Sequence, residues 1–544
     1  MRHKGITRIA IVATAALVAV AGGQIVLDRI LGRPAAPSFR DQICGLPPAW
    51  LELIRRGYHP DRAGQISLLP HHPMYMTTGS GGWTHSGPWD HLQQIPLVFY
   101  APGRVPAGVE PTGEVTVADV APTLAAMLGV ERHAGDRDPG AARDGRVLTE
   151  VVADAPPPKL VVVVVWDGGG WNGLEQWPDA WPVLARLMSD GVSYRSAIVG
   201  SSPSVTPAVH TTLGTGVFPA THGITGVPIR DEHGVVTDAF VDGKSSRFVE
   251  VETLAERWDR RNGGRPEVAM VGYEPWHLGM IGKGAETPGA DRDDAVWINR
   301  RTNRWNTFGA HYAMPRAFRN QQGLDALLEE LDGTDGAVDG SWLRVPLDVR
   351  SRVEETPAFI EHHGAKLTEM IRREGYGRDR VTDLIFTNFK QIDRVAHYYN
   401  MAAPEVEQVM RASDTALGRL VDDLDRTVGQ GDYVVVVTAD HGMQPDVSEL
   451  DSYEIDPNEL ERDLSAEFGP VVRAVWPTEV FLLDDELAAR DVTVEEIARF
   501  IGSYTLGDNS DVEPAKVVGS GDFSAADRLF DLAVPARLLD EVSC

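Results

Sequence analysis

Cysteine and positive charge are both scarce in this sequence of 544 residues. It contains two cysteines, and its 51 Lys and Arg residues stand against 79 Asp and Glu residues, which gives a formal net charge of −28. A nucleic-acid-binding surface needs lysine and arginine to offset phosphates, so this charge balance argues against such a surface. Internal repeats and low-complexity tracts are also absent. The composition, 43% hydrophobic and 24% charged, is that of a globular protein long enough to bury a large core.

The N-terminus has the features of an export signal. Lys and Arg residues precede an apolar run from Ile9 to Ala21, which ends in an A-x-A cleavage pattern. The run resumes to Leu27, so it is also long enough for one uncleaved membrane anchor; a buried core helix is the third interpretation. We expect residues 1–40 to form this signal or anchor and a short tether. The rest of the chain would then be exported, either secreted or held at the outer face of the cytoplasmic membrane, with membrane contact through this segment only.

The remaining sequence alternates between strand-like and helical patterns. Residues 41–154 show this alternation, and the stiff linker Ala155–Pro158 separates them from the second part of the chain. The unbroken apolar runs Leu160–Trp166 and Tyr433–Thr438 are typical of parallel strands buried on both faces, and Leu384–Phe386 is a shorter candidate. This pattern predicts an α/β fold with a mostly parallel central sheet flanked by helices.

Two other stretches of the second part differ from the strands. Pro404–Val428 has the pattern of a long helix. Residues of about 270–380 are irregular and rich in Trp, Arg and Gly, so we expect an insertion or cap over the sheet edge.

Two motifs place polar side chains at the ends of elements. Asp167 follows the run VVVVVW and precedes three glycines, where open α/β sheets build their sites, although acidic residues there are also common turn formers. Thr206 precedes Pro207, the form of a helix N-cap followed by proline at the first helical position. Such a threonine either caps the helix or presents its hydroxyl at the positive end of the helix dipole, where an alkoxide is favoured.

Two Asp–His pairs lie further along the chain. Asp393 and His397 are four residues apart, so on a helix they share one face and can grip one ion, although surface pairs have the same spacing. Asp440 and His441 follow the apolar run Tyr433–Thr438 and precede a glycine. A structural role is the alternative for both pairs, but it explains the second less well, because charged groups rarely end so apolar a strand.

The order of these motifs resembles the alkaline phosphatase superfamily, and within it the type I phosphodiesterase/nucleotide pyrophosphatase branch. The resemblance runs through strand–DG, T-P-x-x-H, D-x-x-x-H and strand–DHG, over about residues 159–445. It implies an alkaline-phosphatase-like sandwich that binds two divalent metal ions. Zinc is favoured by the mixed nitrogen and oxygen ligands, with manganese as the alternative. The ligands that the resemblance implies are Asp167, Thr206, Asp440 and His441 for one metal, and Asp393, His397 and a further histidine for the other.

The further histidine is displaced in this sequence. The family normally supplies it after the DHG segment, but His441 is the last histidine here. Residues 41–154 resemble the family's usual C-terminal portion, and His85 in WTHSG is the candidate ligand. This implies a circular permutation in which residues 41–154 and 159–544 form one hydrolase domain, joined by residues 155–158. The alternative is that residues 41–154 form a separate partial domain.

The permutation also bears on the two cysteines. Cys544 ends the printed sequence and Cys44 begins the moved portion, so the permutation implies that the two lie close together. We expect a disulfide between them in an oxidising compartment, and two free buried cysteines are the alternative.

The resemblance implies that Thr206 is the catalytic nucleophile and forms a phosphothreonine intermediate. The phosphodiesterase branch often has an Asn shortly after H-G-I, where this chain has Val227, and Pro207 has no N–H to offer. His210 and His222 are expected to shape the helix and turn around Thr206 rather than to bind metal. Three side chains are candidates to bind the substrate: Lys390, Arg230 and Asn172.

Several functions remain open from the sequence. Hydrolysis of a small-molecule phosphodiester or pyrophosphate is the leading hypothesis, and phosphomonoester hydrolysis is the nearest alternative. A sulfatase would need a Cys or Ser nucleophile in C-x-P-x-R, and no cysteine lies near Thr206. A catalytically silent, membrane-anchored binding module is the alternative from another class. The sequence does not indicate an oligomeric state.

Overall fold

The computed structural model describes residues 33–78, 82–130, 145–240, 244–348, 352–450, 452–509 and 523–544. The expected signal or anchor, within residues 1–32, lies outside these ranges. Among the described residues, no helix has both the length and the apolar character needed to span a membrane. The chain forms two compact units: a smaller one of Met1–Leu46, Gln65–Gly79 and Val447–Cys544, and a larger one of Pro47–Gly64 and Ser80–Asp446.

The larger unit is built on a sheet in which the described residues form eight strands. The five strands β11, β10, β15, β5 and β16 are mutually parallel, whereas β12 and β3 run antiparallel to their neighbours. The three strands predicted from apolar runs are confirmed as β5, β15 and β16. In order across the sheet, the strands are β12 (Arg304–Asn306), β11 (Asp294–Asn299), β10 (Val268–Val271), β15 (Asp383–Phe389), β5 (Leu160–Trp166), β16 (Tyr433–Thr438), β3 (Leu97–Tyr100) and β6 (Val192–Tyr194).

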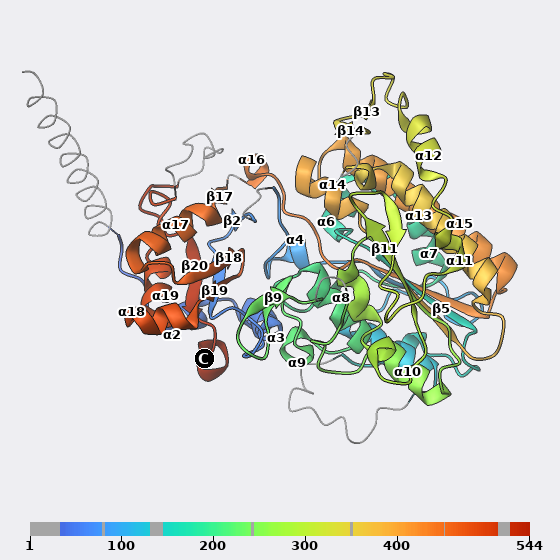
Figure 1. The fold of residues 1–544 in the computed structure, drawn as a ribbon, viewed down its shortest axis with the longest axis horizontal. Helices are drawn as coiled ribbons and strands as arrows, with labels where there is room; N and C mark the ends of the chain where they lie inside the picture. Colours follow the sequence, from blue (N-terminus) through green and yellow to red (C-terminus); the bar gives the residue numbers. More distant parts are fainter. Residues whose placement is uncertain are drawn as a thin grey trace, which may run out of the picture. The chain divides into compact units, whose positions relative to one another are not determined.

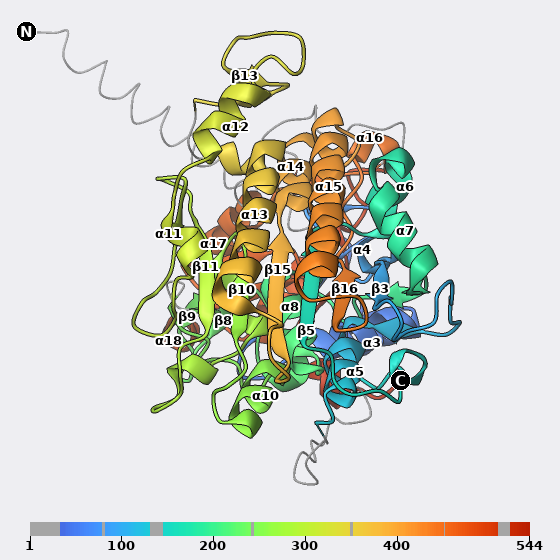
Figure 2. The same ribbon diagram turned by 90° about the vertical axis from the view of Figure 1, so that its right-hand side faces the viewer.

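Strand β5 shows why a run of valines suits the centre of this sheet. Side chains alternate between the faces of a strand, so Val162 and Val164 join one core while Val161 and Val163 join another. The first core includes residues of α13 (Pro357–Met370) and α15 (Pro404–Thr427), which lie over one face of the sheet (Figure 2). The second includes residues of α5 (Val120–Met127), α8 (Thr206–Thr215) and α10 (Leu254–Asn262). Both faces of the sheet are buried at β5, so every position of the strand favours an apolar residue.

The helices of the larger unit follow the expected alternation with strands. The long helix predicted over residues 404–428 is confirmed as α15 (Pro404–Thr427). Besides α13, the other described α-helices of this unit are α3 (Pro48–Gly57), α4 (Asp90–Gln93), α5 (Val120–Met127), α6 (Trp171–Gln176), α7 (Pro182–Asp190), α8 (Thr206–Thr215), α9 (Pro219–His222), α10 (Leu254–Asn262), α11 (Arg316–Arg319), α12 (Leu324–Leu331) and α14 (Gln391–Tyr399). Among its 3-10 helices, η5 (Pro275–Met280) packs against α8.

The expectation of a cap over residues 270–380 is wrong for much of that range. Strands β11 and β12 from this range extend the sheet itself, with β11 parallel to β10. Helix α13 from the same range packs along α15 on one sheet face. The strands were missed because they are short and separated by long connections, so apolar periodicity gives them little signal.

The smaller unit contains an antiparallel sheet of its own. Its strands, in order, are β18 (Val472–Trp476), β19 (Glu479–Leu482), β1 (Ile66–Pro70) and β20 (Phe530–Pro535). Helices α19 (Val494–Gly502) and α17 (Pro457–Phe468) pack against β20 and β18 (Figure 1). The remaining described elements of this unit are α2 (Phe39–Gly45), β2 (Tyr75–Met76), α16 (Val447–Leu450), β17 (Glu454–Ile455), α18 (Asp484–Arg490) and α20 (Leu538–Glu541).

Residues 41–154 contribute to both units, with β1 in the smaller sheet and β3 in the larger one. The expected single hydrolase domain is therefore distributed over two compact units, and that these form one domain stays a prediction. Within the smaller unit, Cys44 and Cys544 form a disulfide with a Cα–Cα distance of 5.5 Å.

Candidate functional site

Three parallel strands bring the candidate residues to one edge of the larger sheet. Asp167 follows β5, Asp440 follows β16, and α14 begins directly after β15 and carries Asp393. The turn after β5 passes close to α14, because Gly168 has a φ of 71° and a Cβ there would lie 2.9 Å from the Asp393 Cα. Glycine therefore allows the close approach of Asp167 and Asp393. Parallel strands present their carboxyl ends together, which explains why residues so distant in sequence meet here.

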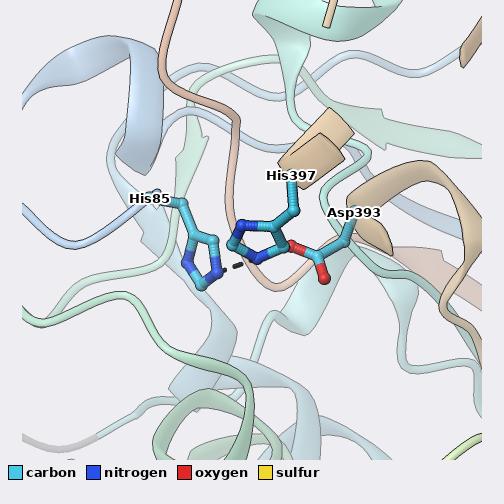
Figure 3. Close-up of side chains that lie close together, drawn as sticks. All are labelled: His85, Asp393 and His397. Atoms are coloured by element: carbon cyan, nitrogen blue, oxygen red, sulfur yellow. Dashed lines mark ion pairs between the residues drawn. The ribbon is translucent and has the colours of Figure 1, made fainter. Parts of the chain in front are cut away.

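Three side chains form what we call the outer group: His85, Asp393 and His397. Asp393 Oδ1 lies 3.1 Å from His397 Nε2 and 3.4 Å from His85 Nε2. Figure 3 shows these three side chains converging, with His397 and Asp393 on one helix and His85 on a separate loop. One ligand atom from each residue lies within 4.8 Å of the others, so the three can hold one ion.

Three further side chains form the inner group: Asp167, Asp440 and His441. His441 Nε2 lies 3.4 Å from Asp167 Oδ1 and 3.5 Å from Asp440 Oδ1. It also lies 3.8 Å from Asp393 Oδ1, and its ring stacks on that of His85 with centroids 3.5 Å apart. The two groups are therefore adjacent and share a boundary at His441 and Asp393.

The histidine tautomers fit metal binding at both groups. The Nδ1 atoms of His85 and His441 donate to the carbonyl oxygens of Ser204 and Gly442, at 2.8 and 2.9 Å. His397 Nδ1 likewise donates to the Trp83 carbonyl. A carbonyl oxygen can only accept, so in its neutral form each of these rings would turn the lone pair of its Nε2 toward the carboxylates. Ligating histidines typically have their other nitrogen anchored in this way.

The buried polar atoms give a second test of this fit. Among the described residues, His441 Nε2 and Asp393 Oδ1 have no hydrogen-bond partner although both are fully enclosed. Buried polar groups are nearly always paired, so such atoms mark a place for a ligand. The donor set of imidazole nitrogens and carboxylate oxygens suits a divalent cation such as zinc.

Burial and neighbouring charges both shift the pKa values of the ligand side chains, and for Asp393 and His441 the two effects oppose each other. Burial, reinforced by His441, lowers the pKa of His85 well below its ordinary value, so this ring is neutral. Burial also raises carboxylate pKa values, but the positive charges of His397 and Lys390 outweigh it and hold the pKa of Asp393 well below its usual range. Against its own burial, His441 has a pKa raised to about 9, chiefly by Asp440.

Lys390 lies between the two groups. Its Nζ is 2.7 Å from Asp167 Oδ1, 2.7 Å from Asp393 Oδ2 and 2.9 Å from Thr206 Oγ1. Burial lowers the pKa of a lysine, but the carboxylates of Asp167 and Asp393 raise it above its ordinary value. The ammonium group is therefore charged: it donates hydrogen bonds to Asp167 and to the Thr206 hydroxyl, and it forms an ion pair with Asp393.

Thr206 differs from the expectation in one respect. Helix α8 begins at Thr206 itself, and Val205, with extended backbone, is the N-cap residue. The expectation that Thr206 caps the helix is therefore wrong, because Pro207 is tolerated throughout the first turn and does not mark its first position uniquely. The Thr206 hydroxyl is not used for capping, and it lies at the positive end of the helix beside Lys390.

The other two candidate substrate-binding residues are engaged with backbone. Arg230 donates to the carbonyl oxygens of Ala63 and Pro60. Asn172 donates to the Met443 carbonyl at 2.6 Å. Of the three candidates, Lys390 is the one that bonds to Thr206.

Two polar residues of the site were not predicted. Asn388 donates to Asp167 Oδ2 at 2.9 Å, and His277, on η5, contacts His210. His210 was expected only to shape the helix around Thr206, and its Nε2 also lies 3.3 Å from Asp440 Oδ2. Nothing local in the sequence distinguishes His277.

Comparisons with known proteins agree with this geometry. Residues 161–529 match the sequence profile of the family described as type I phosphodiesterase / nucleotide pyrophosphatase. Alkaline phosphatase PafA of Elizabethkingia meningoseptica is 23% identical over 362 residues, which cover 58% of this chain and 65% of that protein, a little under two thirds of its length. A Myroides odoratus protein named calcium-transporting ATPase is 22% identical over 401 residues, covering 62% of this chain and 72% of its own.

The crystal structure of wild-type alkaline phosphatase PafA matches with a TM-score of 0.51 at 18% identity, over 69% of this chain and 85% of that chain. This match shows that the chain has the fold of alkaline phosphatase PafA, the alkaline-phosphatase-like fold that the motif order implied. Since the profile match covers well over half of the sequence, the chain belongs to the type I phosphodiesterase / nucleotide pyrophosphatase family.

Proposed function

We propose that this protein is a metal-dependent phosphoester hydrolase with Thr206 as its nucleophile. The observation that carries the proposal is the position of the Thr206 hydroxyl. It lies at the N-terminal start of α8 and 2.9 Å from Lys390 Nζ, which in turn bonds to one carboxylate of each ligand group. A helix start and an ammonium group both favour an alkoxide over a neutral hydroxyl.

The reaction would proceed in two displacements at phosphorus. Thr206 Oγ1 gives up its proton to solvent and attacks phosphorus. The bond from phosphorus to the leaving oxygen breaks and that oxygen takes up a proton from solvent, which gives a phosphothreonine. Water then attacks the same phosphorus and gives up a proton, the bond to Oγ1 breaks, and Oγ1 takes up a proton as phosphate or a phosphomonoester leaves. Lys390 stabilises the negative charge on Oγ1 in both steps through its hydrogen bond.

The residues that would hold the metals are those of the two groups. Asp167, Asp440 and His441, with Thr206, would hold one divalent cation, and Asp393, His397 and His85 would hold the other. Bound there, the cations supply positive charge that lowers the pKa of the threonine hydroxyl and stabilises the leaving oxygen. Zinc is the expected metal from the ligand set, and manganese is the alternative.

The family description favours a phosphodiester or nucleotide pyrophosphate as the substrate. One observation favours a phosphomonoester as second candidate, because a dianionic phosphoryl group benefits more from the added positive charge of Lys390.

The proposal also includes a circular permutation of the chain and its export. A circular permutation is supported by β3, which precedes the profile match in sequence yet completes the same sheet, and export is supported by the Cys44–Cys544 disulfide.

The experiment compares the turnover of bis-p-nitrophenyl phosphate with that of p-nitrophenyl phosphate, before chelation, after chelation and after zinc is returned. We expect activity to disappear with the chelator and return with zinc, and the diester-to-monoester ratio to identify the substrate class. Thr206→Ala should lower turnover by about 10³-fold or more. Activity that survives chelation, or full turnover by Thr206→Ala, would contradict the proposal.

A further inference from the structure

Two buried histidines lie directly behind the inner group. His210 is one helical turn after Thr206 on α8, and His277 is on η5. Both rings are completely enclosed, their centroids are 4.7 Å apart, and their Nδ1 atoms lie 3.0 Å from each other. Neither residue belongs to the outer or inner group, and the proposed reaction assigns neither a role.

The pair faces one oxygen of Asp440. His210 Nε2 lies 3.3 Å from Asp440 Oδ2 and 3.5 Å from the Nδ2 atom of Asn388, whose shorter hydrogen bond of 2.9 Å goes to Asp167 Oδ2. Asp440 Oδ1 accepts from the Gly168 N–H at 3.1 Å and lies 3.5 Å from His441 Nε2. The two oxygens of the Asp440 carboxylate therefore face different partners. Oδ1 faces the inner group, and Oδ2 faces the histidine pair.

The contact between the two rings determines which nitrogen carries each proton. A neutral imidazole has one N–H donor and one acceptor nitrogen, so an Nδ1–Nδ1 hydrogen bond needs one ring of each kind. If His210 presents its Nε2 proton to the Asp440 carboxylate, its Nδ1 must accept, and His277 Nδ1 must donate. Burial, followed by the proximity of His210, lowers the pKa of His277 well below its ordinary value, so this ring is neutral and has a single N–H.

The surrounding glycines show that the pair is closely packed. A Cβ at Gly272 would lie 2.4 Å from His277 Cδ2, and a Cβ at Gly279 would lie 2.1 Å from Thr211 Oγ1 on α8. A side chain at either position would displace His277 or separate η5 from α8. Glycine at both positions therefore permits the approach that brings His277 to His210.

We propose that His277 and His210 are positioning residues that orient Asp440 as a metal ligand. His277 holds His210 in the tautomer that donates from Nε2 to Asp440 Oδ2, which leaves Oδ1 as the ligand oxygen. The inference rests on the proposed metal-dependent function. It connects the two parts of the site, because the helix that presents Thr206 also orients a ligand of the inner group.

The test measures zinc binding by the purified full chain at buffered free-zinc concentrations, with metal content measured by mass spectrometry. His277→Leu removes the donor while filling similar volume, so one of the two zinc ions should bind about 10- to 100-fold more weakly. His277→Asn places an amide N–H near the position of Nδ1, and it should restore zinc affinity to within about 3-fold of the wild type. In turnover, His277→Leu should lower kcat more than it raises KM.

His222→Leu is the matched control. His222 is also completely buried and bonds to α8 through Thr212 Oγ1, but it contacts neither Asp440 nor the other ligands. It should lose stability and keep both zinc affinities. Equal zinc loss in His222→Leu, or unchanged affinity in His277→Leu, would overturn the positioning role while the metal-dependent function stands.

The zinc-binding measurement has a third possible outcome, because the two histidines could themselves bind an ion together with Asp167. Asp167, His210 and His277 also have ligand atoms within 4.8 Å of one another. Three zinc ions in the wild type and two in His277→Leu would show that the pair binds an ion itself, which would overturn the positioning proposal. A wild-type chain that binds neither zinc nor manganese would overturn both this proposal and the proposed function.

Discussion

The outer and inner groups differ in how far solvent reaches them. The His397 side chain is 25% exposed, whereas those of Asp167, Asp440 and His441 are 0–1% exposed. The outer group also takes two of its members from one helix, α14, and the inner group takes all of its members from the ends of two central strands. Strand ends in a sheet buried on both faces move less than a short helix at its edge. We therefore expect the inner group to retain its cation and the outer group to exchange it.

The largest effect should follow from removing an inner ligand. Asp440→Asn keeps the shape of the side chain but removes its charge, so turnover should fall by about 10³-fold or more, and added zinc should not restore it. Measurement of kcat at increasing zinc checks this. Asp423→Asn is a suitable control, because Asp423 is also buried but pairs with Arg372 and Arg426 on a helix surface. If high zinc restored the turnover of Asp440→Asn, the inner group would not differ from the outer group in how readily it exchanges its cation.

Lys390 bonds to both groups, so its removal tests their coupling. Lys390→Met leaves the buried carboxylates of Asp167 and Asp393 without their shared partner, which should cost about 3–5 kcal/mol of stability in the metal-free protein. Zinc should reduce this loss, since a cation supplies the missing charge. Urea unfolding with chelator and with zinc measures the difference, and Lys366→Met, which loses a partly buried pair with Glu369, is the control. An equal loss in both conditions would contradict the explanation.

Removing an outer ligand should have a smaller and reversible effect. His397→Asn should weaken zinc binding by about 10- to 100-fold, and excess zinc should recover most of the turnover because solvent reaches this group. A zinc titration of activity checks both statements. Failure to recover at saturating zinc would remove the distinction between the groups.

The smallest effect concerns pH. The pKa of His441 is about 9 in the metal-free chain, so its Nε2 is protonated at neutral pH and must lose a proton before it can bind a cation. Below pH 9, zinc affinity at the inner group should therefore rise by up to about tenfold per pH unit. His85 of the outer group is already neutral and adds no such dependence. Calorimetry in two buffers of different ionisation enthalpy measures the protons released, and no release at pH 7 would contradict the assignment.

The sequence predicted much of the site because its signals are local. Asp167 and Asp440 each follow a valine-rich run, and so apolar a run predicts both a buried strand and the position of its carboxyl end. Asp393 and His397 have helical spacing and lie on a helix. His85 was reached through the family resemblance, and the structure places it beside Asp393 although 308 positions of sequence separate them.

The remaining features arise from tertiary contacts that no local pattern encodes. His277 is a single histidine in an irregular stretch, and its role depends on how η5 packs against α8. The position of Lys390 between two carboxylates depends on the ends of β5 and β15 meeting. Strands β11 and β12 belong to the sheet because β11 pairs with β10 and β12 pairs with β11. Their short sequences of mixed polarity do not indicate this pairing.

The Cys44–Cys544 disulfide closes a covalent ring through 500 positions of sequence. One cut by a protease at any peptide bond inside that ring opens it without separating the pieces. Such a nicked molecule keeps its full mass on a denaturing gel until a reductant is added, so intactness of this protein has to be judged under reducing conditions.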